Sequence, residues 1–422
     1  MKYDYLKSWQ NDTFKKLDGR GKNLKFLLHQ PTGDNDLCID LHTHTICSDG
    51  MRDDKKLLKE AIENNVDVIA ITDHDTIAGC NLVRKSQLEE KRFNGDIING
   101  VEITSRLQGD PIETLVYDFD LEKANQLIRD NKFPFLNREF KIKKFIELLS
   151  KRLDIINKLN ILDKHLTLND FIAIEIPNES GGVDCKTLAE SGLDIESTIK
   201  SSLKDGNVFQ KIKIDGKVYN LNFDCFNSKL LKFINSTQKG QEYLKQFKTA
   251  DKNEIMKFAE FNRSMIQGKD SPLYVDDSQY YPTVEQVCEF AKQAGGVAIF
   301  AHPFGYGTIK TSPETLMKRA VQAGVDGIEC MHGFNEPNEI EKIYKFCYEN
   351  NLLITAGSDI HGYYATQGTQ TQVGLFPGQG VMSKVDNNVL DRGRISTYNL
   401  HFVGSGAWRG EKEFNIESQP EK

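Results

Sequence analysis

The sequence lacks the features of a membrane-spanning or exported protein. Along its 422 residues, no apolar run approaches the roughly 20 residues needed to cross a bilayer. The first residues, MKYDYLKSWQND, contain no apolar segment of the kind found in signal peptides. None of the 8 cysteines forms a C-x-x-C pair, which argues against a zinc ribbon, and scattered cysteines are typical of reduced, buried thiols. We therefore expect a cytoplasmic protein with no membrane partner.

Signatures of several enzyme classes are missing as well. There is no G-x-S-x-G motif, no P-loop and no G-x-G-x-x-G fingerprint, which argues against serine hydrolases, NTPases, kinases and dehydrogenases. The net charge of −7 excludes a globally cationic nucleic-acid-binding protein but leaves room for a local basic patch. Hydrophobic residues make up 39% of the chain and charged residues 27%, so we expect most of it to fold.

Both ends of the chain contain alternating strand and helix patterns. Short apolar β runs alternate with amphipathic helices, which predicts βα units that build a parallel sheet or a barrel. The expected strands are 37–42, 67–72, 97–104, 113–119, 297–302, 327–332 and 352–359, and the expected helices are 53–64, 283–294, 313–323 and 337–350.

The middle of the chain, 121–281, does not show this alternation of strands and helices. It contains a long amphipathic helix at 138–159 and, at 208–223, two alternating strands joined by Asp-Gly, which suits a type I′ hairpin turn. We interpret this stretch as an insertion that forms a cap beside the site. The predicted organisation is an N-terminal extension at 1–36, a main domain at 37–120 and 282–422, and an insertion subdomain at 121–281. The extension is polar and ambiguous, and its last residues, PTGDND, are turn-rich and suggest a linker or lead-in.

The helix at 138–159 is basic, with seven Lys or Arg against three acidic residues. Such a helix is commonly a solvated face, and the alternative is contact with the phosphate of a nucleotide or oligonucleotide. In the second case Arg138 and Lys141 are candidate substrate contacts. Tyr and Phe of the insertion could stack on a base or pack in a core.

Metal-competent side chains stand at the ends of at least five expected strands. His42 and His44 form an H-x-H whose imidazoles lie on the same side of an extended chain. The carboxyl ends of barrel strands meet on one face, where active sites are built. The full set is His42, His44, Asp49, His74, Glu102, His302, Asp359 and His361.

Imidazole and carboxylate are ligands for Zn, Mn or Fe, and the set contains no thiolate. A histidine at the end of one strand is commonly a core or loop residue, but the joint pattern favours a metal site. Eight groups exceed the four ligands of one tetrahedral ion, so we expect two or three ions. A cluster of this kind generates hydroxide at neutral pH and holds a phosphoryl group during in-line displacement.

Several other polar residues have two interpretations each. His332 also ends a strand and is either a substrate contact or structural. Asp73 and Asp75 either orient His74 or lie in a turn, and Glu329 is another candidate for support behind the ligands. The remaining histidines, which we expect to be structural, are His29, His165 and His401.

Five motifs together resemble the PHP family of polymerase and histidinol phosphatase metallophosphoesterases. They are DLHTHTICSDG (40–50), ITDHDT (71–76), GVEIT (100–104), AHPFGYG (301–307) and GSDIHG (357–362). The resemblance implies a distorted (β/α)7 barrel with a trinuclear metal site built from the eight residues above. The family usually has one more His, and here Glu113, eleven residues after Glu102, stands in that place. Its oxygen donors would shift metal preference toward Mn or Mg.

Within that family the arrangement is similar to bacterial phosphatases that act on nucleoside 3′,5′-bisphosphates and on short RNA 5′ ends. The resemblance thus implies hydrolysis of a phosphomonoester of nucleotide type, with short single-stranded RNA as a further substrate and His332 or His361 as general acid. The alternatives are a histidinol-phosphate phosphatase, a non-catalytic metal-binding module and an editing module that needs a polymerase partner. The oligomeric state is left open.

Overall fold

The computed structural model describes part of the chain, in two compact units. One unit is drawn from residues 1–137 and 281–422, and the other from 138–280. The second unit thus begins at Arg138, whereas the insertion was expected from residue 121. The division into separate domains stays a prediction. The described residues are 12–24, 39–48, 50, 52–90, 93–171, 173–177, 183–188, 190, 192, 211–214, 217–222, 225–247, 256, 258–266, 270–276, 280–306, 309–332 and 335–361.

A seven-stranded sheet forms the centre of the first unit, in the order β1-β2-β3-β4-β9-β10-β11. Its first and last strands meet, since Leu41 N donates to Ala356 O at 3.0 Å and His44 N donates to Ile360 O at 3.1 Å. The sheet is therefore a nearly closed barrel, as predicted. The strands are β1 (Ile39–Asp40), β2 (Val68–Ile71), β3 (Asp96–Leu107), β4 (Asp110–Tyr117), β9 (Val297–Phe300), β10 (Gly327–His332) and β11 (Leu353–Gly357).

Strand β4 runs against both of its neighbours, whereas the sequence pattern predicted parallel strands. The cause is a two-residue turn between β3 and β4, in which Gln108 and Gly109 have φ angles of 52° and 97°. Two consecutive positive φ values are the signature of a type I′ hairpin turn. As a result, the beginning of β4 lies beside the carboxyl ends of the other strands.

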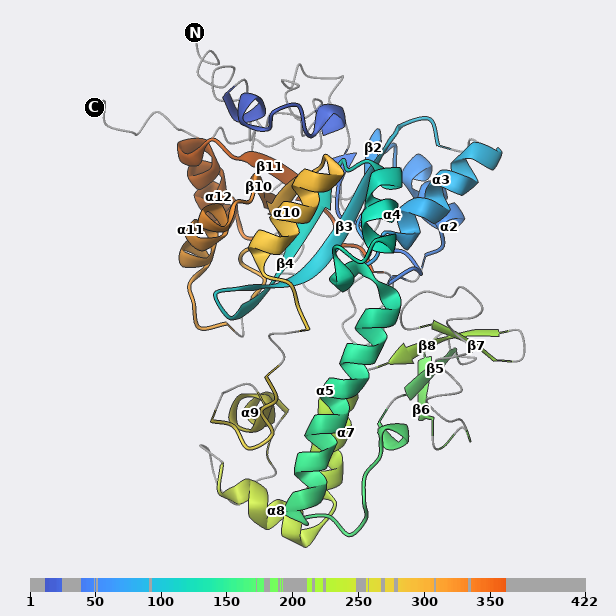
Figure 1. Ribbon diagram of the computed structural model, residues 1–422, viewed down its shortest axis with the longest axis vertical. Helices are drawn as coiled ribbons and strands as arrows, with labels where there is room; N and C mark the ends of the chain where they lie inside the picture. The colour runs from blue at the N-terminus through green and yellow to red at the C-terminus, as the bar shows by residue number, and fades with distance from the viewer. Residues whose placement is uncertain are drawn as a thin grey trace. The chain divides into compact units, whose positions relative to one another are not determined.

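Helices cover the outside of the barrel, and their ends follow local sequence signals (Figure 1). Thr283 and Gln286 form a capping box at the start of α10, and Gly295, with φ of 83°, ends that helix. Asp53 caps α2 by accepting a hydrogen bond from Lys56 N. The four predicted helices of this unit are confirmed. The helices are α2 (Asp54–Glu63), α3 (Ala78–Glu90), α4 (Leu121–Arg129), the short η2 (Pro134–Leu136), α10 (Val284–Ala294), α11 (Pro313–Ala323) and α12 (Pro337–Asn350).

Residues 12–24, part of the predicted N-terminal extension, pack onto the barrel. Leu17 and Leu24 are buried in the main hydrophobic core. Arg20 donates to the carboxylate of Asp326 and to Gly296 O. Apolar and ionic contacts with distant parts of the chain therefore hold these residues, whereas the turn-rich stretch at 31–36 lies outside the described residues.

Tyr117 of β4 is a fully buried member of the main hydrophobic core. Its hydroxyl donates to Leu41 O at 2.7 Å. Burial raises the pKa of the Tyr117 hydroxyl well above its usual range. The Tyr117 side chain thus connects β4 to the segment that follows β1, which carries His42 and His44.

The second unit combines helices with a four-stranded sheet in the order β6-β5-β8-β7. Strands β7 and β8 form the predicted hairpin, with Ile214 opposite Lys217. Leu153 and Ile156 of α5 belong to the same buried cluster as Leu230 of α7. The elements are α5 (Arg138–Leu159), η3 (Leu168–Asp170), β5 (Ala173–Pro177), β6 (Val183–Thr187), β7 (Lys211–Ile214), β8 (Lys217–Asn222), α7 (Cys225–Asn235), α8 (Gln238–Lys245), α9 (Phe258–Phe261) and η4 (Asn262–Ile266).

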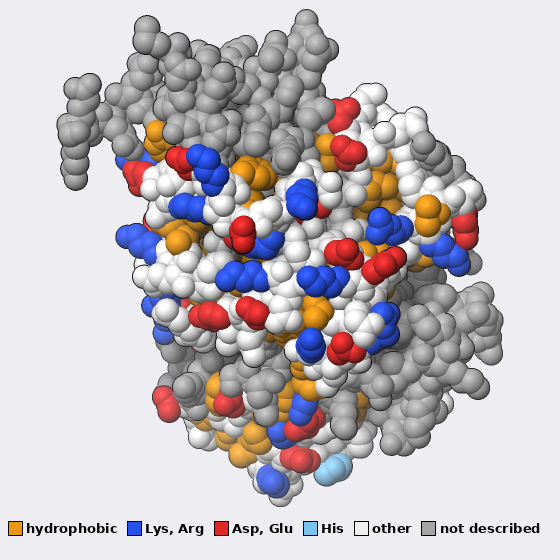
Figure 2. Space-filling model, turned by 45° about the horizontal axis from the view of Figure 1, so that its top comes forward, with side chains coloured by type: hydrophobic (Ala, Val, Ile, Leu, Met, Phe, Trp, Pro, Cys, Tyr) orange, Lys and Arg blue, Asp and Glu red, His pale blue; other side chains and the backbone are white. Residues whose placement is uncertain are grey.

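Charged side chains of both signs are interspersed on the face drawn in Figure 2. This distribution gives that face no strong field of a single sign. Among the described residues, no helix is both long enough and apolar enough to cross a membrane.

Candidate metal centre

Side chains from separate strands converge on a cavity of about 340 Å³ in the first unit. Most contributors follow the carboxyl ends of parallel strands, as the sequence predicted. Glu113 enters from the beginning of β4, because that strand is reversed. The cavity is lined by His74, Glu102, Glu113, His302, Phe304, Gly305, His332, Asn335, Asp359 and His361.

Glu102 lies at the centre of the constellation and is fully buried. Its Oε2 lies 3.1 Å from His42 Nε2, and its Oε1 lies 3.1 Å from His302 Nε2. His44 Nε2 and His74 Nδ1 each lie 3.3 Å from Oε2. One carboxylate therefore faces four imidazoles, an arrangement that suits a bridging ligand between two ions.

Asp359 has a second set of imidazole partners. Its Oδ1 lies 3.1 Å from His44 Nε2 and 3.3 Å from His42 Nε2. Its Oδ2 lies 3.2 Å from His332 Nε2, and its backbone oxygen lies 3.0 Å from His361 Nδ1. The left-handed backbone of Asp359, with φ of 54°, accompanies this placement. Because His332 contacts a candidate ligand and lines the cavity, both interpretations of this residue stay open.

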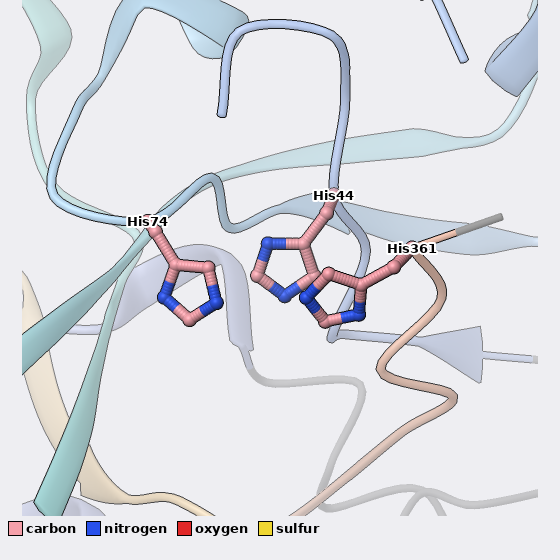
Figure 3. A group of neighbouring side chains, drawn as sticks. All are labelled: His44, His74 and His361. Carbon is pink, nitrogen blue, oxygen red and sulfur yellow. The ribbon is translucent and has the colours of Figure 1, made fainter. Parts of the chain in front are cut away.

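Three overlapping groups of donor atoms could each hold a metal ion. Within each group the ligand atoms lie within 4.8 Å of one another. Figure 3 shows one of them, in which the rings of His44, His74 and His361 come from three separate chain segments and gather at one place. The ring centroids of His44 and His361 are 4.0 Å apart. The other groups are His42, His44, Glu102 and Asp359, and His74, Glu102 and Glu113.

Glu113 contributes a third carboxylate. Its Oε2 lies 3.2 Å from His302 Nε2, and it belongs to one of the donor groups. Its backbone N donates to the buried hydroxyl of Tyr306 at 2.8 Å, which fixes the backbone at this position. The structure thus brings Glu113 to the place that the sequence suggested, whereas Asp49 lies outside the described residues.

Mutual electrostatics set the protonation of the cluster. Burial alone would lower the pKa of His42, but Glu102, Glu329 and Asp359 raise it well above its usual value. Burial likewise opposes protonation of His302, and the nearby carboxylates again raise its pKa well above normal. Although burial raises the pKa of the Glu102 and Asp359 carboxyls, the imidazoles around them hold both pKa values well below normal. The ionised carboxylates are therefore stabilised by nearby positive charge, which protonated imidazoles or metal cations can supply.

Asp73 supports the site indirectly. Its Oδ1 accepts from Thr45 N and Ser48 Oγ at 2.7 Å each, and its Oδ2 accepts from Thr45 Oγ1 at 2.7 Å. These hydrogen bonds fix the segment that follows His44. Asp75 Oδ1 accepts from Thr104 N on β3. The hydrogen bonds described for Asp73 and Asp75 go to backbone and hydroxyl groups of neighbouring segments.

Two buried acids, Glu329 and Asp40, stand behind His42. Asp40 was not among the residues that the sequence predicted for the site. Glu329 Oε1 lies 2.9 Å from His42 Nδ1, in line with one of its two interpretations. Asp40 accepts from Ser358 N and Ser358 Oγ at 2.9 and 2.7 Å, and from His42 N at 3.3 Å. Its position inside the DLHTH motif could have drawn attention to it, since a buried strand rarely carries an unpaired acid.

The candidate substrate contacts of the basic helix, Arg138 and Lys141, stay predictions. Nothing is described for the side chains of Arg138 and Lys141, although both lie within α5. Elsewhere on α5, Lys151 Nζ lies 3.0 Å from Glu147 and 2.9 Å from Tyr280 Oη, and Arg152 donates to a backbone oxygen within the second unit. Part of the positive charge of this helix is therefore engaged within its own unit.

Of the three histidines that we expected to be structural, only His165 is among the described residues. His29 and His401 lie outside the described residues. His165 belongs to the second unit, and its Nε2 lies 3.3 Å from Asn157 Nδ2.

The donor set fits divalent cations. It offers imidazole nitrogen and carboxylate oxygen without thiolate, which suits Zn, Mn or Fe, and its carboxylates also suit Mg. Each pair of donor groups has one residue in common, either His44, His74 or Glu102, so neighbouring ions would lie close together. Closely spaced ions in an open cavity are suited to binding a phosphoryl group.

Comparison with known proteins identifies one family over part of the chain. Residues 40–173 match the model of the PHP domain. A 5'-3' exoribonuclease of Haemophilus influenzae is 24% identical over 324 residues, which cover 76% of this chain and 89% of the relative. The 5'-3' exoribonuclease Rnm of Salmonella typhimurium is 34% identical over 91 residues, which cover 22% of this chain and 30% of that protein. These matches confirm the resemblance seen in the sequence motifs.

Two solved structures also align over most of the chain. A protein of Bifidobacterium adolescentis, described as a metal-dependent phosphoesterase, has a TM-score of 0.45 at 20% identity, covering 86% of this chain and 96% of its own. An amidohydrolase of Chromobacterium violaceum has a TM-score of 0.43 at 17% identity, covering 84% and 96%.

Proposed function

We propose that the substrates of this chain, a metal-dependent hydrolase of ester bonds that contains a PHP domain, are phosphomonoesters of nucleotides. The observation that carries the proposal is the convergence of imidazoles on Glu102 and Asp359 inside one cavity. Support for nucleotides comes from the relatives, which are named 5'-3' exoribonucleases. A nucleoside 3′,5′-bisphosphate or the 5′ end of a short RNA is the proposed substrate.

We assign the metal ions to the donor groups around Glu102 and Asp359. His42, His44 and His74 would supply nitrogen, and the two carboxylates would supply oxygen. When bound, two or three such ions supply Lewis acidity and positive charge toward a phosphoryl group and an attacking water. Further proposed ligands are Asp49, Glu113, His302 and His361.

The protein residues would orient the substrate and handle protons. Glu102 and Asp359 place negative charge in front of the imidazoles, with their oxygens facing Nε2 of His42 and His44. His332 and His361 line the cavity and carry ring nitrogens that could protonate a leaving oxygen. Phe304 and Asn335 form another part of the cavity wall, which would contact the organic part of the substrate.

A phosphate-release assay tests this proposal. Metal-replete protein would be incubated with nucleoside 3′,5′-bisphosphates, mononucleotides, histidinol phosphate and a short 5′-phosphorylated RNA, each with and without a chelator. Chelator-sensitive turnover that prefers the nucleotides or the RNA is the expected result. Preference for histidinol phosphate would contradict the nucleotide assignment and favour a histidinol-phosphate phosphatase. Absence of turnover with metal confirmed bound would favour the non-catalytic module.

A further inference from the structure

Glu329 on β10 contacts two of the proposed ligand residues at once. Its Oε1 lies 2.9 Å from His42 Nδ1, and its Oε2 accepts from the backbone N of His302 at 2.9 Å. The side chain is fully buried and faces away from solvent. Glu329 is not among the residues that line the cavity, so it acts behind the site rather than in it.

The contact with His42 determines which ring nitrogen faces the cavity. An ionised carboxylate can only accept hydrogen bonds, so Nδ1 of His42 must carry the hydrogen. Nε2 is then the atom directed at Glu102 and Asp359, at 3.1 and 3.3 Å. Imidazole binds a metal through a nitrogen lone pair, and an acceptor on the other nitrogen fixes both the tautomer and the ring orientation.

The contact with His302 joins two strands. Strands β9 and β10 are parallel neighbours, with Gly327 opposite Ile299. Beyond the paired residues, the Oε2 of Glu329 takes the place of a backbone acceptor for His302 N. The same carboxylate therefore fixes the ring of His42 and the backbone of His302, two residues that contact different oxygens of Glu102.

We propose that Glu329 is a positioning residue that holds His42 and His302 in the orientation needed to bind divalent cations. This proposal rests on the proposed metal centre. It predicts that replacing Glu329 weakens metal binding in protein that still folds.

The variant Glu329→Gln tests the proposal with little change in volume. A glutamine amide offers one acceptor and one donor group, so it cannot accept from both His42 and His302. We expect divalent affinity to fall roughly 10- to 100-fold. The measurement is competition for Zn²⁺ and for Mn²⁺ against a chromogenic chelator, together with the metal content of the purified protein.

Asp326→Asn is the matched control. Asp326 is also a largely buried carboxylate with two partners, Arg20 and the backbone N of Ala298, but it contacts no proposed ligand. We expect this variant to lower the unfolding midpoint and to leave metal affinity unchanged. Equal affinity in Glu329→Gln and the unaltered protein would overturn the proposal, and so would an equal loss in both variants. If the unaltered protein binds neither metal, the proposed function fails before Glu329 is tested.

The unaltered protein provides a second measurement if Glu329→Gln does not fold. In Zn²⁺-loaded protein labelled with ¹⁵N-histidine, the ring shifts of His42 report which nitrogen carries hydrogen. A protonated Nδ1 is the expected result. A protonated Nε2 would contradict the proposal, because the nitrogen facing Glu102 would then have no lone pair.

Discussion

Arg20 and Asp326, 306 positions apart in the sequence, form a bidentate ion pair. The two hydrogen bonds measure 2.9 and 2.8 Å, and both side chains are mostly buried. A planar guanidinium matches a carboxylate in this geometry, which a lysine does not. The pair fastens the N-terminal segment to the barrel.

Replacing Arg20 should therefore destabilise the barrel. In Arg20→Ala, Asp326 loses a charged partner, so we expect the free energy of unfolding to fall by about 1–3 kcal/mol. Denaturant titration measures this loss, and Lys15→Ala, at an exposed ion pair with Asp12, serves as the control. Turnover per folded molecule should be unchanged in both variants. Unfolding midpoints that coincide for the two variants would show that the pair does not anchor the segment.

Removal of a proposed ligand should abolish turnover without unfolding the protein. His42→Ala and Asp359→Ala each remove a donor from the same group of four, so we expect activity to fall by at least about 100-fold. Steady-state phosphate release gives the activity, and circular dichroism checks the fold. His165→Ala, in the second unit, should behave like the unaltered protein. Normal activity in either ligand variant would show that the site is wrongly assigned.

Glu113 should influence which metal supports activity. Glu113→Gln removes a charged oxygen donor beside His302, so we expect weaker activation by Mn²⁺ and Mg²⁺. Glu113→His, which supplies nitrogen instead, should shift the preference toward Zn²⁺. Activity measured against the concentration of each metal separates these cases. Superimposable titrations for Glu113→Gln and the unaltered protein would exclude Glu113 as a ligand.

Metal binding should release protons. The pKa values of His42 and His302 are raised in the metal-free protein, so a cation must displace protons from their imidazoles. We expect metal affinity to increase with pH. Calorimetry in buffers with different ionisation enthalpies counts the released protons. A binding enthalpy that is independent of the buffer would contradict this prediction.

The same groups predict how the metal-free protein responds to pH. The raised pKa values of the two histidines stabilise the fold fully below about pH 6.5, and this contribution is lost as pH rises through the folded-state values. The lowered pKa values of Glu102 and Asp359 stabilise it above about pH 4, and that contribution is lost as pH falls. We expect the cluster to stabilise the metal-free protein most between about pH 4.5 and 6.5. Thermal unfolding midpoints across pH 4–9 would reveal a different optimum if the assignment were wrong.

The sequence predicted the parts of the site that depend on local pattern. His42 and His44 lie two residues apart at a strand end, so extended backbone alone brings both to one side. His74 and His302 follow the ends of buried strands, and barrel closure brings such ends together. The location of these donors therefore needed only the rhythm of strands and helices. Glu102 lies within β3, which continues to Leu107 instead of ending where the sequence predicted.

Contacts between distant segments could not be predicted in this way. The reversed direction of β4 depends on positive φ at Gln108 and Gly109, and Gln-Gly is a weaker turn signal than Asn-Gly. The docking of Arg20 on Asp326 leaves no local pattern in either segment. Glu329 lies in the middle of a buried strand, where only the three-dimensional structure shows its two partners.

The length of the short turn between β3 and β4 also determines which side chain of β4 faces the metal centre. Thr104 stands opposite Glu113 across the hairpin, and the turn of Gln108 and Gly109 fixes that register. Side chains alternate between the two faces of a strand, so a register slip by one residue would turn Glu113 to the opposite face. A one-residue insertion in this turn would thus change the carboxylate count of the centre while Glu102 stays in place. The composition of the centre depends on the length of a loop that contains none of its ligands.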